Sequence, residues 1–211
     1  MDTKDRILSA ALALFNDKGL NTISSKTISE DLSMSYGNLC YHFPKKEDII
    51  MRLHQNLLDE LDEHFQRVQD DIFEFDFMMS SIKHMMELTL KYRFLFLSSN
   101  ELHLKYPSIK QKSIERARVY QSVLFKISKF LMANGYMRNV TDDKQVKMFI
   151  HGLLIVFNAW IADALYFHNK AEDEQKLLYY LQLLFSLLRP ALTTKGTEAF
   201  HAVYNKMMIQ D

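Results

Sequence analysis

The sequence predicts an all-α fold, with a small three-helix domain at residues 1–50 and a larger helical domain at residues 51–211. Glycine and proline account for only 5 and 3 of the 211 residues, and because these residues punctuate turns, their scarcity favours long helices. Apolar side chains recur at three- and four-residue intervals, which is the spacing of one helix face. No segment alternates apolar and polar residues for long enough to indicate a sheet.

The first helix is expected at residues 3–16, where apolar side chains recur at helical spacing. Thr3 can cap its start, and Gly19 follows its end, where a left-handed backbone costs glycine little. A second, short helix reaching residue 32 is expected after Ser24 or Ser25, either of which can cap it. These two helices begin the three-helix domain.

A tight break at residues 33–35 precedes a third short helix at residues 36–42. After Pro44 a long fourth helix is expected to reach about residue 70. Pro107 suits the first turn of a later helix, and Thr141 can cap another. The remaining helices are expected at roughly 74–91, 93–104, 107–134, 142–168, 172–190 and 195–208.

Charge and cysteine content limit the function classes. The 26 basic and 26 acidic residues give a formal net charge of zero, which argues against coating nucleic acid by bulk charge but not against a local DNA-reading surface. The single cysteine, Cys40, cannot form an internal disulfide and suits a reducing compartment. We find no apolar leader at the start and no run of about 18 apolar residues. We therefore expect a cytoplasmic protein with no membrane partner.

The second and third short helices have the proportions of a DNA-binding helix-turn-helix. In the third, Leu39 and Phe43 lie four residues apart and can anchor the helix inward. Phosphate oxygens accept hydrogen bonds from phenol and imidazole groups, and an amide can read base edges. A small amphipathic helix with a solvated polar face is the alternative. The groups left for a partner belong to Tyr36, Asn38, Cys40, Tyr41 and His42.

Residues 7–49, ILSAALALFNDKGLNTISSKTISEDLSMSYGNLCYHFPKKEDI, resemble the N-terminal domain of the TetR (tetracycline repressor) family. The AA..LF of the first helix, the spacing of Gly19 and Thr22, and the closing YHF.KKEDI all fall in register. The chain has Ser33 where the family usually has a glycine in the turn. It has Cys40 where the family usually has an aromatic residue, which puts the usual contact at that position in doubt.

The resemblance implies a homodimeric transcriptional regulator that binds a palindromic operator in double-stranded DNA and is released as a repressor by a small, largely apolar effector. Ser25 and Lys26 would meet phosphate or a groove edge. One trio would enter the major groove and a second would hold phosphates on either side. The first trio is Tyr36, Gly37 and Asn38, and the second is Tyr41, His42 and Lys46.

The domain at residues 51–211 resembles the family only in architecture and is rich in methionine and aromatic residues. Such side chains can line a cavity for an apolar ligand, and plain core packing is the alternative for each of them. Buried polar groups need partners, so two polar residues of the 142–168 helix could hold a polar end of the ligand or pair across a dimer seam. The candidate ligand-binding residues are Met85, Phe96, Phe125, Asn158, Trp160 and Asp163.

The helices at 142–168 and 172–190 are apolar around more of their circumference than one buried stripe requires. A monomer would leave an exposed apolar patch, which soluble proteins avoid. Pairing with a second copy in a four-helix bundle would cover both faces. Leu184 is expected near that seam, so a charge there should give monomers.

No catalytic or metal site is expected. The chain has no glycine-rich phosphate loop, nucleophile elbow or HExxH helix, and its eight histidines do not cluster with cysteines or carboxylates at metal-ligand spacing. We therefore expect neither an enzyme nor a cofactor. The alternative to a regulator is a helical binding or carrier protein without DNA-binding activity, which would have no use for the polar groups on the 36–42 helix.

Overall fold

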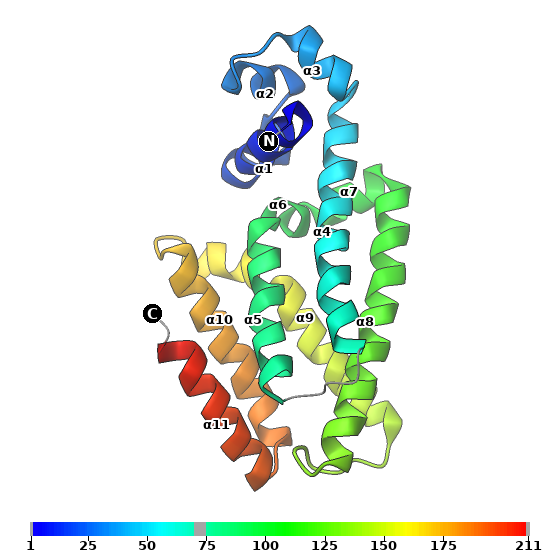
Figure 1. Ribbon diagram of the computed structural model, residues 1–211, viewed down its shortest axis with the longest axis vertical. Helices are drawn as coiled ribbons and strands as arrows, with labels where there is room; N and C mark the ends of the chain where they lie inside the picture. Colours follow the sequence, from blue (N-terminus) through cyan, green and yellow to red (C-terminus); the bar gives the residue numbers. More distant parts are fainter. Residues whose placement is uncertain (1, 70–74, 210–211) are drawn as a thin grey trace. The chain divides into compact units, whose positions relative to one another are not determined.

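The computed structural model describes residues 2–69 and 75–209 and shows helices joined by short connections (Figure 1). Within those residues the β-structure is limited to one isolated antiparallel bridge, between Met137 and Leu192, so the all-α prediction is confirmed. The helices are α1 (Thr3–Lys18), η1 (Leu20–Thr22), α2 (Ser25–Asp31), α3 (Tyr36–His42), α4 (Lys46–Gln69), α5 (Phe75–Lys91), α6 (Arg93–Leu97), α7 (Ser99–Lys105), α8 (Pro107–Ala133), α9 (Asp143–Phe167), α10 (Asp173–Leu188), η2 (Arg189–Ala191) and α11 (Thr194–Ile209).

The structure differs from the expected helices in two caps and in the division of one helix. Asp2 rather than Thr3 caps α1, and Asp142 rather than Thr141 caps α9. Each aspartate accepts from a backbone N–H of the first turn, and its negative charge also suits the positive end of the helix. The helix expected at 93–104 is divided at Ser98 into α6 and α7, because serine has a low preference for helix interiors.

Packing divides the chain into two compact units, residues 1–63 with 91–110 and residues 64–90 with 111–211. The boundary expected at residue 50 between the functional domains stays a prediction. In the first unit, Phe15 of α1 packs against Phe94 of α6 with ring centroids 5.1 Å apart. Both side chains are fully buried, so α6 belongs to the core of the unit that holds α1–α3.

The turn between α2 and α3 contains a residue in the left-handed region. Ser33 has φ of 52°, and its N–H donates to the carbonyl of Glu30. The following N–H, of Met34, donates to the carbonyl of Ser29 at 2.9 Å. A left-handed backbone costs a residue with a Cβ roughly 1–2 kcal/mol, which explains why glycine is the usual choice in such a turn.

The core of the second unit is built around Trp160 of α9 and Tyr180 of α10, whose rings lie 5.5 Å apart. Trp160 is 2% exposed, and its indole N–H donates to the hydroxyl of Thr89 at 2.9 Å. This bond satisfies a polar group that would otherwise be costly to bury. The helices α5, α9, α10 and α11 all contribute buried side chains to this core.

Among the longer helices, α9 has the most apolar composition. By length and composition it could span a membrane, since its most apolar 18-residue stretch has a mean hydropathy of 1.7. Of that stretch, 22% is buried. Because His151, Asn158 and Asp163 interrupt it, the helix holds no run of about 18 apolar residues, as expected. Length and composition are weak evidence, since a helix covered by a partner in a soluble protein meets the same criterion.

Candidate nucleic-acid interface and apolar cavity

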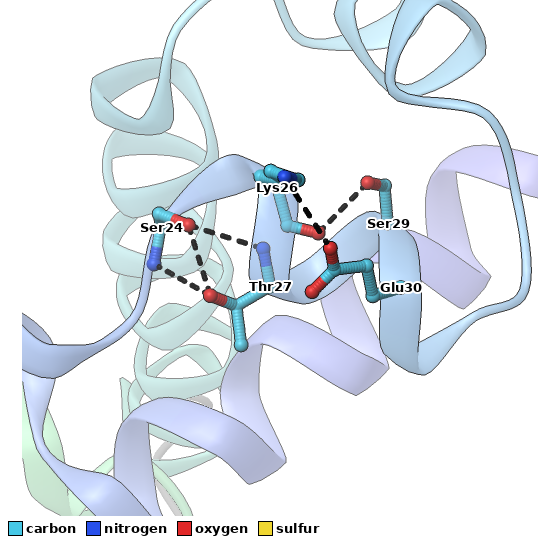
Figure 2. Close-up of polar contacts among 5 residues, drawn as sticks. All are labelled: Ser24, Lys26, Thr27, Ser29 and Glu30. Atoms are coloured by element: carbon cyan, nitrogen blue, oxygen red, sulfur yellow. Dashed lines mark hydrogen bonds and ion pairs between the residues drawn. The ribbon is translucent and has the colours of Figure 1, made fainter.

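The start of α2 is fixed by a reciprocal pair of hydrogen bonds. The N–H of Thr27 donates to Ser24 Oγ at 3.1 Å, and the N–H of Ser24 donates to Thr27 Oγ1 (Figure 2). This capping box holds two backbone donors that the helix itself leaves unpaired. It also places Ser25 and Lys26 in the first helical turn, with the Lys26 side chain 76% exposed and only loosely paired with Glu30, at 3.8 Å.

The helix α3 has one buried side and one exposed side. Ser35 caps it by accepting from the N–H of Asn38 at 3.2 Å, and Leu39 and Phe43 are buried. The opposite side carries Tyr36 and Tyr41, which are 54% and 82% exposed. Gly37 and Asn38 are exposed on the same side. The anchors therefore lie where the sequence predicted them, and the polar groups face outward.

Two neighbours modify the chemistry of this exposed side. A hydrogen bond with Cys40 raises the pKa of the Tyr36 phenol. The rings of Tyr41 and His42 meet edge to face at 5.2 Å. His42 is half-buried, so its imidazole lies beside the phenol of Tyr41 and is less exposed than that phenol.

Lys46 lies away from this surface. Its ammonium donates to the carbonyl of Leu20 at 2.5 Å and lies 5.5 Å from the centre of the Phe15 ring. Burial lowers the pKa of Lys46, with a further contribution from the nearby charge of Lys105. Lys46 opens α4, and its ammonium binds a carbonyl of the 3₁₀ turn η1, 26 positions earlier in the chain. Lys45, one residue earlier, is exposed.

The second unit contains an apolar cavity of about 170 Å³ between α5, α8, α9 and α10. Its polar lining residues among the described part of the chain are Ser81 and Ser128. Both hydroxyls already donate to carbonyls one turn back, Ser81 to Phe77 and Ser128 to Leu124. The apolar lining includes Met78, Met79, Ile82, Met85, Leu124, Ile127, Leu131, Phe149, Leu153, Phe157 and Leu184.

Of the six candidate ligand-binding residues, only Met85 lines this cavity. Trp160 is buried in the core outside the cavity lining and is bonded to Thr89. Asn158 is exposed, and so is Asp163, which accepts from the hydroxyl of Tyr180. The two polar residues are therefore not directed at the cavity, because they lie on the outer side of α9.

The two remaining aromatic candidates also lie elsewhere. Phe96 belongs to α6 in the first compact unit. Phe125 lies outside the cavity lining, with the ammonium groups of Lys129 and Lys147 within 6 Å of its ring. The signal that sequence reasoning underused was the stripe Phe149, Leu153 and Phe157, whose helical spacing places it on one face of α9.

Two family models match the chain. One, described as "Bacterial regulatory proteins, tetR family", matches residues 7–53, and the other, described as "Bacterial transcriptional repressor", matches residues 57–200. The chain belongs to the TetR family. It is a helix-turn-helix transcriptional regulator of that family, with α2 and α3 as the helix-turn-helix, and the resemblance found in residues 7–49 is confirmed.

Relatives of this TetR-family chain support the same conclusion. Two HTH-type transcriptional regulators of Staphylococcus aureus, from strains MRSA252 and USA300, are 27% identical over 95 and 125 residues, or 44% and 59% of the chain. The chain spans 51% and 62% of the lengths of these relatives.

Solved structures show the same fold. A TetR-family transcriptional regulator from Marinobacter aquaeolei superposes with a TM-score of 0.87 at 24% identity, over 97% of this chain and 98% of that one. The ketosteroid transcriptional regulator KstR2 of Mycobacterium tuberculosis gives 0.68 at 17% identity, over 91% and 96%. At these identities the likeness extends to the fold.

Proposed function

We propose that this regulator is a cytoplasmic repressor that binds a palindromic operator as a homodimer and is released by a small, largely apolar ligand. The exposed side of α3 carries the proposal, because it presents a phenol, an amide and a bare glycine backbone on a helix held firmly from behind by Leu39 and Phe43. A core helix would have no use for these groups, whereas a helix lying in a major groove needs them.

Within this surface the residues take different roles. Asn38 is suited to base edges, because a carboxamide can pair with adenine in the major groove. Tyr36 and Gly37 would accompany it into the groove. The exposed Lys26 and Tyr41, with Ser25 and His42 beside them, would hold phosphates. Lys45 replaces Lys46 in the phosphate-contacting set, because the Lys46 ammonium is bonded to Leu20.

The cavity of the second unit supports an apolar effector. An engineered protein cavity of about 150 Å³ with a similar aliphatic and aromatic lining stays dry and binds benzene. Methionines such as Met78, Met79 and Met85 adapt to different ligand shapes. Because both serine hydroxyls in the lining are already bonded to carbonyls, the body of the ligand within the cavity would be hydrocarbon. A ligand shifts the equilibrium only by its differential affinity for the bound and released states.

The exposed apolar side chains of α9 and α10 support the homodimer. Ile155 is 58% exposed, and Leu183 and Leu187 are 37% and 40% exposed. Pairing both helices with those of a second copy would bury this patch in an isologous four-helix contact. Leu184, by contrast, is 4% exposed and lines the cavity, so a charge there would disrupt the core of the unit rather than test the seam.

Selection of bound DNA from a random duplex pool tests the proposal. The full chain should enrich an inverted repeat, with affinity falling steeply as the salt concentration rises, because bound phosphates release counterions. The double variant Asn38→Ala, Tyr41→Ala is the matched control and should enrich nothing. Failure of the wild-type chain to enrich any motif, while it binds small apolar molecules, would favour a carrier protein.

A further inference from the structure

Residues 184–200 contribute alternately to two hollows of the second unit. Leu184, Leu188 and Leu192 line the apolar cavity described above. Arg189, Thr194 and Glu198, interspersed with them in sequence, line an open hollow of about 490 Å³ that also includes Arg138. Leu192 lines both hollows, so they adjoin at this residue.

The open hollow carries an excess of positive charge. Arg189 has no ion pair with any residue that the structure describes. Arg138 uses its Nε to donate to the carbonyl of Leu192 at 3.2 Å, which leaves its terminal nitrogens available. Glu198 is the single acidic residue in the lining. Two guanidinium groups against one carboxylate suit an anion, and the planar guanidinium fits a carboxylate or phosphate with two parallel hydrogen bonds.

The backbone beside Leu192 is fixed. Arg138 donates its N–H to the carbonyl of Ala191 at 2.8 Å, and Thr193 donates to that of Tyr136 at 3.0 Å. Gly196 packs so closely on Tyr136 that a Cβ at this position would lie 1.9 Å from the Tyr136 carbonyl oxygen. The backbone is therefore held on both sides of Leu192, the residue that the two linings share.

We propose that the effector is an amphiphilic organic anion, whose hydrocarbon chain fills the apolar cavity and whose charged head binds Arg138 and Arg189. This inference rests on the proposed ligand response and adds the chemical class of the ligand. The two arginines would bind the polar end of the ligand. The cavity lining does not bind it, because the hydroxyls of Ser81 and Ser128 already donate to carbonyls.

Isothermal titration calorimetry on the full-length protein, below the micelle concentration of each probe, tests this assignment with decanoate, decanol and inorganic phosphate. Decanoate should bind more tightly than decanol. The variant Arg138→Gln, Arg189→Gln should weaken decanoate about tenfold or more while leaving decanol unchanged, because it removes two charge-assisted contacts. Arg189→Gln alone should give part of the effect without touching the bond of Arg138 to Leu192.

Two control variants separate the contribution of the charged head of the probe from that of its hydrocarbon chain. Arg118→Gln, at an exposed position of α8 outside both hollows, should bind both probes as the wild type does. Leu153→Trp, which fills the cavity, should weaken both. Decanoate binding no more tightly than decanol in the wild type, or decanoate affinity unchanged in every variant of Arg138 and Arg189, would overturn this inference and leave the apolar effector standing. Phosphate binding as tightly as decanoate would also overturn it. Absence of binding by both carbon chains would overturn the two proposals together.

Discussion

The side-chain amide of Asn16 joins the end of α1 to the start of α6. Its Oδ1 accepts from the N–H of Phe94 at 3.1 Å, and its Nδ2 donates to the carbonyl of Lys91 at 2.8 Å. The N–H of Phe94 lies at the start of α6, and the carbonyl of Lys91 lies at the end of α5. Helix ends leave such donors and acceptors unpaired within the helix. A single side chain thus connects the α5–α6 junction with the helix that supports the helix-turn-helix.

We predict that Asn16→Ala lowers the free energy of unfolding by about 1–2 kcal/mol, because it removes both bonds and leaves the part-buried N–H of Phe94 without its partner. Asn21→Ala is the matched control. Asn21 donates to Glu101 at 2.8 Å between exposed groups, so its loss should cost less than about 1 kcal/mol. Urea unfolding followed by circular dichroism measures both, and equal losses would show that Asn16 has no special role.

Ser33→Gly should stabilise the protein by about 0.5–1 kcal/mol. The substitution relieves the left-handed strain at φ of 52°, and the greater freedom of glycine in the unfolded chain offsets part of this gain. Ser35→Ala should instead destabilise it by about 1 kcal/mol, because Ser35 caps α3. Thermal unfolding distinguishes the two, and a lower melting temperature for Ser33→Gly would contradict the prediction.

Alkaline pH should destabilise the first unit through Tyr92. Burial and the hydrogen bond to Glu60 raise the pKa of this phenol above its usual value of about 10. The folded state therefore keeps the proton where the unfolded state loses it. The stability that Tyr92 contributes is complete below pH ~10 and is lost as the pH rises above that value.

Urea unfolding from about pH 8 to about pH 11 tests this dependence, because this range brackets the ordinary tyrosine pKa. The Tyr92→Phe variant should show a shallower fall in stability with pH than the wild type. Tyr41→Phe is the control, because its side chain is 82% exposed, and it should keep the wild-type slope. Parallel curves for the wild type and Tyr92→Phe would rule out Tyr92 as the source.

Ile155→Glu should convert the dimer to a monomer and weaken DNA binding. The charge would lie within the exposed apolar patch of α9, where a second copy would have to bury it without a partner. Leu104→Glu places the same charge at another exposed leucine, which is 85% exposed on α7, and should leave the assembly intact. Sedimentation velocity at micromolar concentration decides the question, and a monomeric wild-type protein would refute the dimer.

The sequence was sufficient to predict the helices and the outward-facing residues of α3, because apolar spacing and capping residues are local signals. Lys46 shows where such reasoning stops: its bond to Leu20 joins residues 26 positions apart, and no local pattern records it. A related limit applies to the ligand candidates on α9, which stay predictions and lie outside the lining of the cavity. Asn158 and Asp163 lie in an apolar helix, and only the packed structure shows that their side of α9 is exposed.

Binding of the selected operator duplex by single variants of α3 tests the central claim most directly. Fluorescence anisotropy at fixed salt should show that Tyr41→Ala weakens binding to all sequences alike. Asn38→Ala should change the preferred base at one position in each half-site, by about 1–3 kcal/mol. Asn205→Ala, at an exposed position of α11, should bind as the wild type does. Wild-type affinity and base preference in both α3 variants would show that this helix does not read DNA.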